Sequence, residues 1–229
     1  MPLTSVTRLP GGLSNQPVSS IFADLKQPFP GTYAHYFTDF LPFVAADWTL
    51  TGTGSVAAAT VGSGGLININ SLAGAEQSMQ SAILPFVPAI TKELFFSARI
   101  AVDNAGLSGF FAGLVALDGT PYASSPTDGI FIKKTAGVTN ATATLRVAGV
   151  DVAVQVMDVS FVAGTFVDVG FAYTPTEGAL RAFVGDAAVR LATNPASFGA
   201  AIQMAPALSS FGAAGRTLAA DYVYVAQGR

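Results

Sequence analysis

Apolar residues recur at every second position along much of the chain after Tyr33, in short segments bounded by turn residues. In the segment 94–102, for example, Leu94, Phe96 and Ile100 alternate with Ser97 and Arg99. Successive side chains of a β-strand point to opposite faces of its sheet. The segment therefore predicts a strand with one face in a core and the other in water.

Other segments predict further strands. The same period of two is seen in Val150, Val152, Val154 and Val156 against Asp151 and Gln155, and in Val167, Val169, Phe171 and Tyr173 against Asp168. The segment 110–117 is apolar on both sides. That pattern predicts a strand in the middle of a sandwich or beneath a second layer, and it is equally compatible with an oligomer contact.

Turn residues separate the predicted strands. Ala148-Gly149 precedes the valine segment, and Gly185-Asp186 separates 180–184 from 187–191. The Gly-Asp pair suits a two-residue hairpin turn that needs a positive φ at its first position. Ser63-Gly64-Gly65 separates two more segments. With about a dozen strands and no convincing amphipathic helix, the sequence predicts an all-β, antiparallel two-sheet β-sandwich or jelly roll.

The first 32 residues differ from the rest of the chain. Five prolines and three glycines interrupt them, which excludes a long helix or a central strand. Apolar residues still recur there, although a purely flexible linker would not need them. We therefore expect an extended N-terminal arm over residues 1–32, either laid over a neighbour or disordered at its start, and one β-sandwich domain over residues 33–229. The candidates for contact with a neighbouring subunit or shell are Leu3, Arg8, Leu9, Phe22, Lys26 and Phe29.

The chain carries few charges. Charged residues make up 11% of it, whereas an ordinary soluble domain has about 25%. This composition favours a protein that contacts other protein surfaces. The net charge of −3 argues against a nucleic-acid partner, because that kind of binding depends on Lys and Arg neutralising phosphates.

We expect neither a membrane partner nor export. The charge-free stretch 48–75 is rich in Gly, Ser, Thr and Asn, which are costly to place in lipid. The first twelve residues lack the apolar run of a secretory signal, so synthesis in the cytosol is expected.

Residues that could carry catalysis are scarce. The chain has no cysteine, and its one histidine, His35, is expected to pack or to form a hydrogen bond. Glycosidases with a β-sandwich fold need two carboxylates about 5–9.5 Å apart, and the three glutamates Glu76, Glu93 and Glu177 lie on different segments. We therefore expect no enzyme activity and no cofactor.

Several other polar residues and the single tryptophan have ordinary structural interpretations. Asp103, Asp118 and Asp128 could meet around calcium, but turn chemistry explains them better. The pair Lys133-Lys134 is expected where a strand reaches solvent. Trp48 is expected to close the edge of the core.

Five stretches resemble a family of tailed-phage virion proteins with a concanavalin-like jelly roll, and the resemblance covers nearly the whole chain. These stretches are residues 3–12, the aromatic-acidic segment 36–40 with Asp47-Trp48, residues 127–131, residues 182–186 and the ending 216–229. Leu41-Pro42 departs from the family, which often has more acidic or aromatic residues there. The fold class implied is an all-β, antiparallel two-sheet β-sandwich, a jelly roll of concanavalin or laminin-G type with an extended N-terminal arm.

The resemblance implies a non-enzymatic bacteriophage structural protein. Its expected role is a capsid decoration or cement protein, a homotrimer that binds the major capsid protein on the outer surface of the virion. The alternative is a lectin-like module of the virion that binds host glycans, with exposed aromatic and amide side chains such as Tyr122 and Asn140 as contacts.

Overall fold

The computed structural model describes residues 33–59, 65–82, 86–193, 195, 198 and 202–229. The arm predicted over residues 1–32 lies outside the described residues, as do its six candidate contacts, Leu3, Arg8, Leu9, Phe22, Lys26 and Phe29. The boundary predicted between arm and sandwich therefore stays a prediction. Among the described residues, no helix is long and apolar enough to cross a membrane.

The described residues form fifteen strands and one short 3-10 turn, η1 (Ala45–Asp47), which is slightly more than the dozen strands predicted. The strands are β1 (Tyr33–Thr38), β2 (Trp48–Gly52), β3 (Ser55–Ala58), β4 (Ile67–Asn70), β5 (Glu76–Ser81), β6 (Leu94–Val102), β7 (Gly109–Val115), β8 (Gly129–Lys134), β9 (Ala141–Val147), β10 (Val150–Met157), β11 (Val167–Thr174), β12 (Ala179–Val184), β13 (Ala187–Thr193), β14 (Ala205–Phe211) and β15 (Thr217–Gly228).

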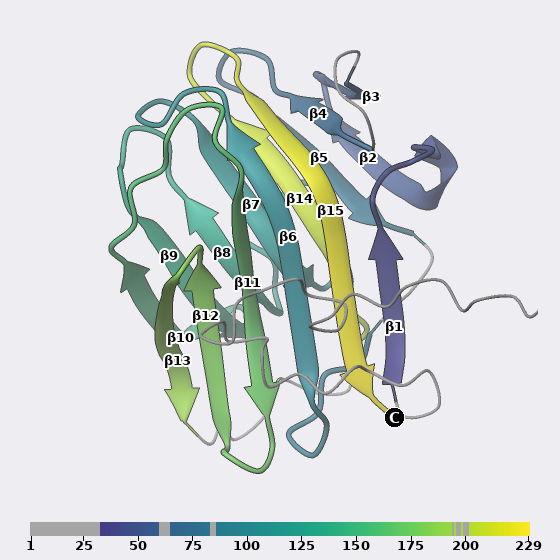
Figure 1. Ribbon diagram of the computed structural model, residues 1–229, viewed down its shortest axis with the longest axis vertical. Helices are drawn as coiled ribbons and strands as arrows, with labels where there is room; N and C mark the ends of the chain where they lie inside the picture. Colours follow the sequence, from purple (N-terminus) through teal and green to yellow (C-terminus); the bar gives the residue numbers. More distant parts are fainter. Residues whose placement is uncertain (1–32, 60–64, 83–85, 194, 196–197, 199–201) are drawn as a thin grey trace, which may run out of the picture.

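Two antiparallel sheets make up the sandwich. The eight-stranded sheet has the order β13-β12-β11-β6-β15-β4-β3, and β1 pairs with the second half of β15. The seven-stranded sheet has the order β10-β9-β8-β7-β14-β5-β2. In Figure 1 the eight-stranded sheet lies in front of the other. The predicted fold class, an all-β two-sheet sandwich, is confirmed.

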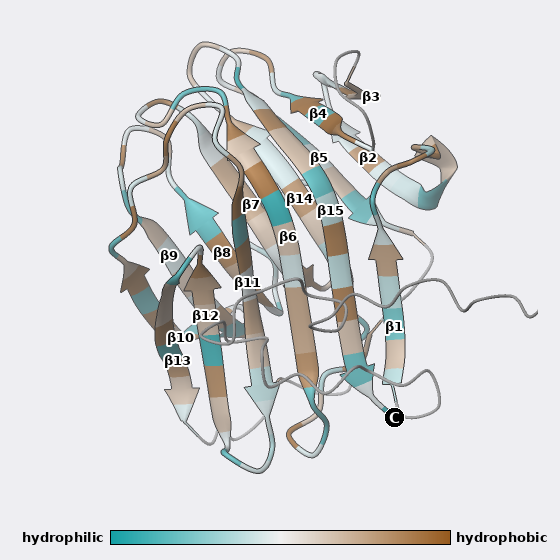
Figure 2. Cartoon of the chain, viewed as in Figure 1, coloured by the Kyte–Doolittle hydropathy of each residue, from teal (hydrophilic) through white to brown (hydrophobic). Residues whose placement is uncertain are grey.

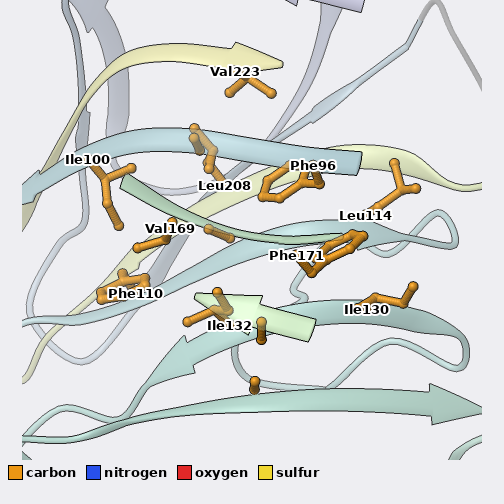
Figure 3. Packing of buried hydrophobic residues seen from close by; sticks show 14 of the residues in the cluster. Phe96, Ile100, Phe110, Leu114, Ile130, Ile132, Val169, Phe171, Leu208 and Val223 are labelled. Atoms are coloured by element: carbon orange, nitrogen blue, oxygen red, sulfur yellow. The ribbon is translucent and has the colours of Figure 1, made fainter. Parts of the chain in front are cut away.

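The main core lies between the two sheets. Phe96 of β6 stacks on Phe171 of β11, with ring centroids 5.3 Å apart and planes 14° apart. The seven-stranded sheet contributes Phe110, Leu114 and Ile132 from the opposite side, and all are buried (Figure 3). Hydrophobic residues also run along β6, β11 and β15 in Figure 2. The alternating segments thus place one apolar row of each sheet in the shared interior.

The predicted turns are present where they are described. Ala148 (φ 50°) and Gly149 (φ 79°) join β9 to β10, and positive φ at both positions is what a type I′ hairpin requires. Gly185 (φ 56°) opens the turn between β12 and β13, as predicted. Residues 63 and 64 of the third predicted turn lie outside the described residues.

The valine segment is a strand, but the expectation that its valines face the core is wrong. Val150, Val152, Val154 and Val156 of β10 are all between 47% and 63% exposed. The pairing register between β10 and β9 shifts between Asp151 and Ala153, so Val152 is an extra residue in a β-bulge. After the bulge, Ala153 and Met157 face inward, whereas Val154 and Val156 of this edge strand face outward.

Candidate functional site on the outer face of the seven-stranded sheet

The outer face of the seven-stranded sheet carries polar as well as aromatic side chains. Because the core takes Met79 of β5 and Phe110 of β7, their neighbours along each strand point to the opposite side. One row of paired residues across this face runs from β5 to β10: Ser78, Ser209, Phe111, Lys133, Thr142 and Val156. Polar side chains thus lie on both sides of Phe111 in this row, which ends in Val156 at the edge of the sheet.

The connection between β7 and β8, residues 116–128, folds back over part of this face. The Ser78 hydroxyl donates to the Gly119 carbonyl oxygen at 2.6 Å. The Gln80 amide nitrogen donates to the carbonyl oxygens of Val115 and Ala116, and its amide oxygen accepts from the Asp118 N–H at 3.0 Å. Side chains of β5 therefore hold the first half of the β7–β8 loop.

Glu76 holds the middle of the loop. Its carboxylate oxygens accept the backbone N–H groups of Tyr122 and Ala123 at 2.8 and 2.9 Å. Burial raises the pKa of Glu76, although the two N–H donors oppose that shift. A carboxylate placed in this way fixes two consecutive backbone amides and stiffens the loop.

Tyr122 packs the loop against the sheet. Its ring stacks on Phe211 of β14 with centroids 4.8 Å apart, and its hydroxyl accepts the Ala136 N–H at 3.0 Å. The Lys133 ammonium donates to the Tyr122 carbonyl oxygen at 2.6 Å and lies 4.7 Å from the ring centroid. The prediction that Tyr122 is an exposed contact for glycans is wrong, because its ring is enclosed in this way.

The apolar pattern of the segment 110–117 is explained by this loop. Phe111 and Val115 point away from the main core, yet both are fully buried in a second cluster with Tyr122 and Phe131. The sequence left open whether this segment lies inside a sandwich, beneath a second layer or at an oligomer contact. Within the single chain, β7 lies beneath a second layer, the β7–β8 loop.

The prediction that Lys133-Lys134 marks a strand reaching solvent is wrong. Lys134 is fully buried and donates to the Ser108 carbonyl oxygen at 2.8 Å, and Lys133 is half-buried under the loop. Burial lowers the pKa of both ammonium groups. The β6–β7 connection with Ser108 and the β7–β8 loop with Tyr122 contact this end of β8. The alternation of residues within β8 does not indicate either contact.

Beyond the loop, the side of this face formed by β9 and β10 carries exposed side chains. Arg146 Nη1 and Asp151 Oδ1 are 2.6 Å apart, and both side chains are partly exposed. Thr142 and Thr144 lie on the same face of β9, each paired with a valine of β10, Val156 and Val154. Thr144 is only 5% exposed, and we call the accessible residues Thr142, Arg146, Asp151, Val154 and Val156 the open strip.

The open strip combines two kinds of surface. Its ion pair presents charged hydrogen-bonding groups, and its valines present an apolar patch beside them. Sequence reasoning missed the strip because it assigned the valines to the core. The unpaired edge position of β10 and the bulge at Val152 come only from the pairing of strands.

The aspartates considered for calcium are used within turns. Asp103 accepts from the Ser108 hydroxyl at 2.5 Å, Asp118 accepts from the Thr120 N–H at 2.9 Å, and Asp128 accepts from the Ala148 N–H at 2.9 Å. Within the described ranges, no group of three or more His, Asp or Glu side chains could hold a metal ion.

Three further residues were singled out from the sequence. Trp48 is buried at the start of β2 and contacts Tyr36 and Phe40, which agrees with a plug at the edge of the core. His35 is exposed on the edge strand β1, so the prediction that it packs or forms a hydrogen bond is not supported by its position. Asn140 is half-buried in the turn before β9, and it accepts only a long bond of 3.4 Å from its neighbour Thr139.

Known structures share this architecture at low sequence identity. The fold is that of the lectin-like β-sandwiches. Peanut lectin, solved with a nine-residue peptide, has a TM-score of 0.62 at 11% identity over 85% of this chain and 97% of the lectin. Arcelin-5, a lectin-like defense protein from Phaseolus vulgaris, has a TM-score of 0.64 at 9% identity over 86% of this chain and 99% of its own. No protein-family model and no curated protein matches the chain.

The expectation of no enzyme activity needs correction. Crh5 transglycosylase, solved in complex with NAG, has a TM-score of 0.59 at 15% identity over 83% of each chain. The fold thus occurs in a carbohydrate-active enzyme as well as in lectins, so the fold class does not exclude catalysis. In addition, Asp118 of the β7–β8 loop lies close enough to Glu76 for its charge to help raise the pKa of Glu76, a proximity that the separation of these residues along the chain does not reveal.

Proposed function

We propose that the chain is a carbohydrate-binding module that binds glycans at the open strip. The observation that carries the proposal is the placement of the Arg146–Asp151 ion pair beside exposed Val154 and Val156 on one sheet face. A sugar ring presents hydroxyl groups at its edge and C–H groups on its face. A few fixed polar groups beside apolar surface suit both.

The anchored β7–β8 loop supports this proposal. Glu76, Ser78 and Gln80 hold the first part of the loop over β5. The end of the loop is fixed at the β9–β10 turn beside the open strip, because the Gly149 N–H donates to the Thr127 carbonyl oxygen and Asp128 accepts from the Ala148 N–H. A preformed surface loses less entropy on binding than a surface that must be ordered first. The lectin-like neighbours add that the fold is suited to this use.

A glycan array of the full chain, followed by titration calorimetry with the strongest oligosaccharide, tests the proposal. Replacing Arg146 by Ala removes a charged donor, and we expect about 10- to 100-fold weaker binding. The matched control is Arg181→Ala. Arg181 forms a similar exposed ion pair with Glu177 at 2.9 Å, but on the outer face of the other sheet.

Two results would contradict the proposal. One is an array without a single bound glycan, and the other is an equal loss of affinity in Arg146→Ala and Arg181→Ala. Chromatography of the same oligosaccharides after incubation shows whether they are also cleaved or transferred. The predicted capsid partner and homotrimer stay predictions, and light scattering of the full chain measures the trimer.

A further inference from the structure

The eight-stranded sheet has an aromatic cluster on its outer face, away from the main core. It consists of Phe95, Ala172, Phe183, Tyr224 and Ala226, with Tyr33 and Tyr222 packed against it, and we call it the outer aromatic face. All seven residues belong to the strands of this sheet or to β1 at its edge. The described part of the cluster therefore includes no residue from a covering layer.

Phe95 is nevertheless only 3% exposed. Its direct neighbours on the adjacent strands are Ala172 of β11 and Ala226 of β15. Besides these two methyl groups, the cluster puts aromatic rings around Phe95, of which that of Tyr33 is 6.4 Å away. Neighbours within the sheet border the ring from the sides, so its near-complete burial indicates a further group over its outer side.

Tyr224 gives an independent indication of a covering segment. Its hydroxyl is buried and has no hydrogen-bond partner among the described residues. Two residues earlier on the same face, the Tyr222 hydroxyl donates to Asp168 Oδ1 at 2.7 Å. Buried polar groups in proteins are nearly always paired, so the Tyr224 hydroxyl points to a partner supplied from outside the described residues.

We propose that residues 1–32 of the same molecule cover the outer aromatic face. The chain enters the sheet at Tyr33, whose ring lies 6.4 Å from that of Phe95 and whose hydroxyl donates to Glu93. The arm therefore begins beside the face that it covers, and this proximity favours its own face over that of a second molecule.

The length and composition of the arm fit this face. An extended chain of 32 residues reaches on the order of 100 Å, whereas eight strands about 4.8 Å apart are roughly 40 Å wide. Apolar residues recur along the arm, among them Ile21, Phe22 and Phe29, and only Arg8, Asp24 and Lys26 are charged. Backbone carbonyl groups of such a segment are suitable acceptors for the Tyr224 hydroxyl.

The other parts of the chain outside the described residues are short, and the described residues next to them lie away from the outer aromatic face. Phe86, which follows residues 83–85, pairs with Met204 and belongs to the main core. Phe198 packs edge-to-face on Tyr173, also in the main core. Residues 60–64 connect β3 to β4, and β4 pairs with the first part of β15, Thr217–Ala220, whereas the outer aromatic face contains β15 residues only from Tyr222 onward.

Paramagnetic relaxation tests the proposal on the full chain. The protein has no cysteine, so Arg181→Cys provides a single site for a nitroxide label. Arg181 lies in the paired row Arg181, Ala172, Phe95, Ala226 and His35, which crosses the outer aromatic face. Val154→Cys, on the opposite outer face of the sandwich, is the matched control label.

We expect the label at position 181 to broaden amide signals of residues 1–32 within one molecule, and the label at position 154 to leave them unchanged. A mixture of isotope-labelled chain with spin-labelled, unenriched chain should show no broadening. Broadening only in the mixture would instead assign the face to a second copy and overturn the proposal. Equal broadening from both labels, or none from either, would overturn it as well.

Deletion of residues 1–32 provides a second measurement. The exposed aromatic face should raise the fluorescence of the hydrophobic dye ANS several-fold while the circular dichroism of the strands is retained. An unchanged dye signal from a folded truncated chain would contradict the proposal. If the truncated chain does not fold, the relaxation experiment still decides.

Discussion

Replacement of Glu76 is the sharpest test of how the β7–β8 loop is held. The carboxylate accepts two backbone N–H groups, from Tyr122 and Ala123, at 2.8 and 2.9 Å. A hydrogen bond to a charged group contributes about 1.5–3 kcal/mol. Relief of carboxylate burial offsets part of the loss, so we expect Glu76→Ala to lower the free energy of unfolding by about 2–3 kcal/mol.

Urea unfolding followed by the fluorescence of Trp48 measures this change, since Trp48 is the only tryptophan and is buried. Amide hydrogen exchange of Tyr122 and Ala123 should become faster in the variant, because both N–H groups lose their acceptor. Glu177→Ala is the control. Glu177 forms an exposed ion pair, and its loss should change stability by less than about 1 kcal/mol.

The pH dependence of the free energy of unfolding shows whether ionisation of Glu76 stabilises or destabilises the fold. Burial raises the pKa of Glu76 above its ordinary value of 4.5 in the folded chain. The folded state then binds the proton more tightly than the unfolded state, so this contribution to stability is complete below pH 4.5. It is lost as the pH rises through the folded pKa. The stability of the natural chain relative to Glu76→Gln should therefore fall as the pH rises from 4.5.

One combined result would show that Glu76 does not hold the loop. Glu76→Ala would have to match the natural chain within about 0.5 kcal/mol, the scale of an ordinary surface substitution, with unchanged exchange of the Tyr122 amide.

Two further predictions concern buried positions of the seven-stranded sheet. Lys134→Met keeps most of the side-chain volume and removes a buried charge, so urea unfolding should show an equal or higher free energy of unfolding. Lys134→Ala should lower that free energy by about 2–4 kcal/mol. A large loss in both variants would mean that the ammonium group itself stabilises the fold. Gly113→Ala should lower the melting temperature strongly, because a Cβ there would lie 2.5 Å from the Ile130 carbonyl oxygen. Gly106→Ala is the control and should have little effect, since its Cβ would lie 3.7 Å from the nearest atom. Similar shifts of the melting temperature in both variants would show that the close approach at Gly113 is unimportant.

The sequence predicted the strands well where one apolar row serves the core. Leu94, Phe96, Phe171 and Tyr173 all lie in the main cluster, as their alternation indicates. Local turn chemistry was equally readable, since Gly185 adopts the positive φ expected of its turn. These features depend on neighbours within a few residues, which the order of amino acids records directly.

The same period of two does not reveal which row faces inward when both are apolar or when a bulge intervenes. The valines of β10 illustrate this, because one extra residue at position 152 turns Val154 and Val156 outward. Phe95 and Phe111 look like solvent-side positions of their strands, yet both are buried on outer faces. The burial of Phe111 depends on the β7–β8 loop, which the alternation within β7 does not record.

The candidate site shows the same division. The sequence by itself determined an all-β sandwich with few charges, because side-chain period and composition are properties of the chain alone. Only the tertiary structure decided that Glu76 and Lys133 hold a loop, and that Arg146 and Asp151 form an ion pair beside exposed valines. The register between strands and the return of the β7–β8 loop bring these groups together, and both are set by long-range packing that no short segment encodes.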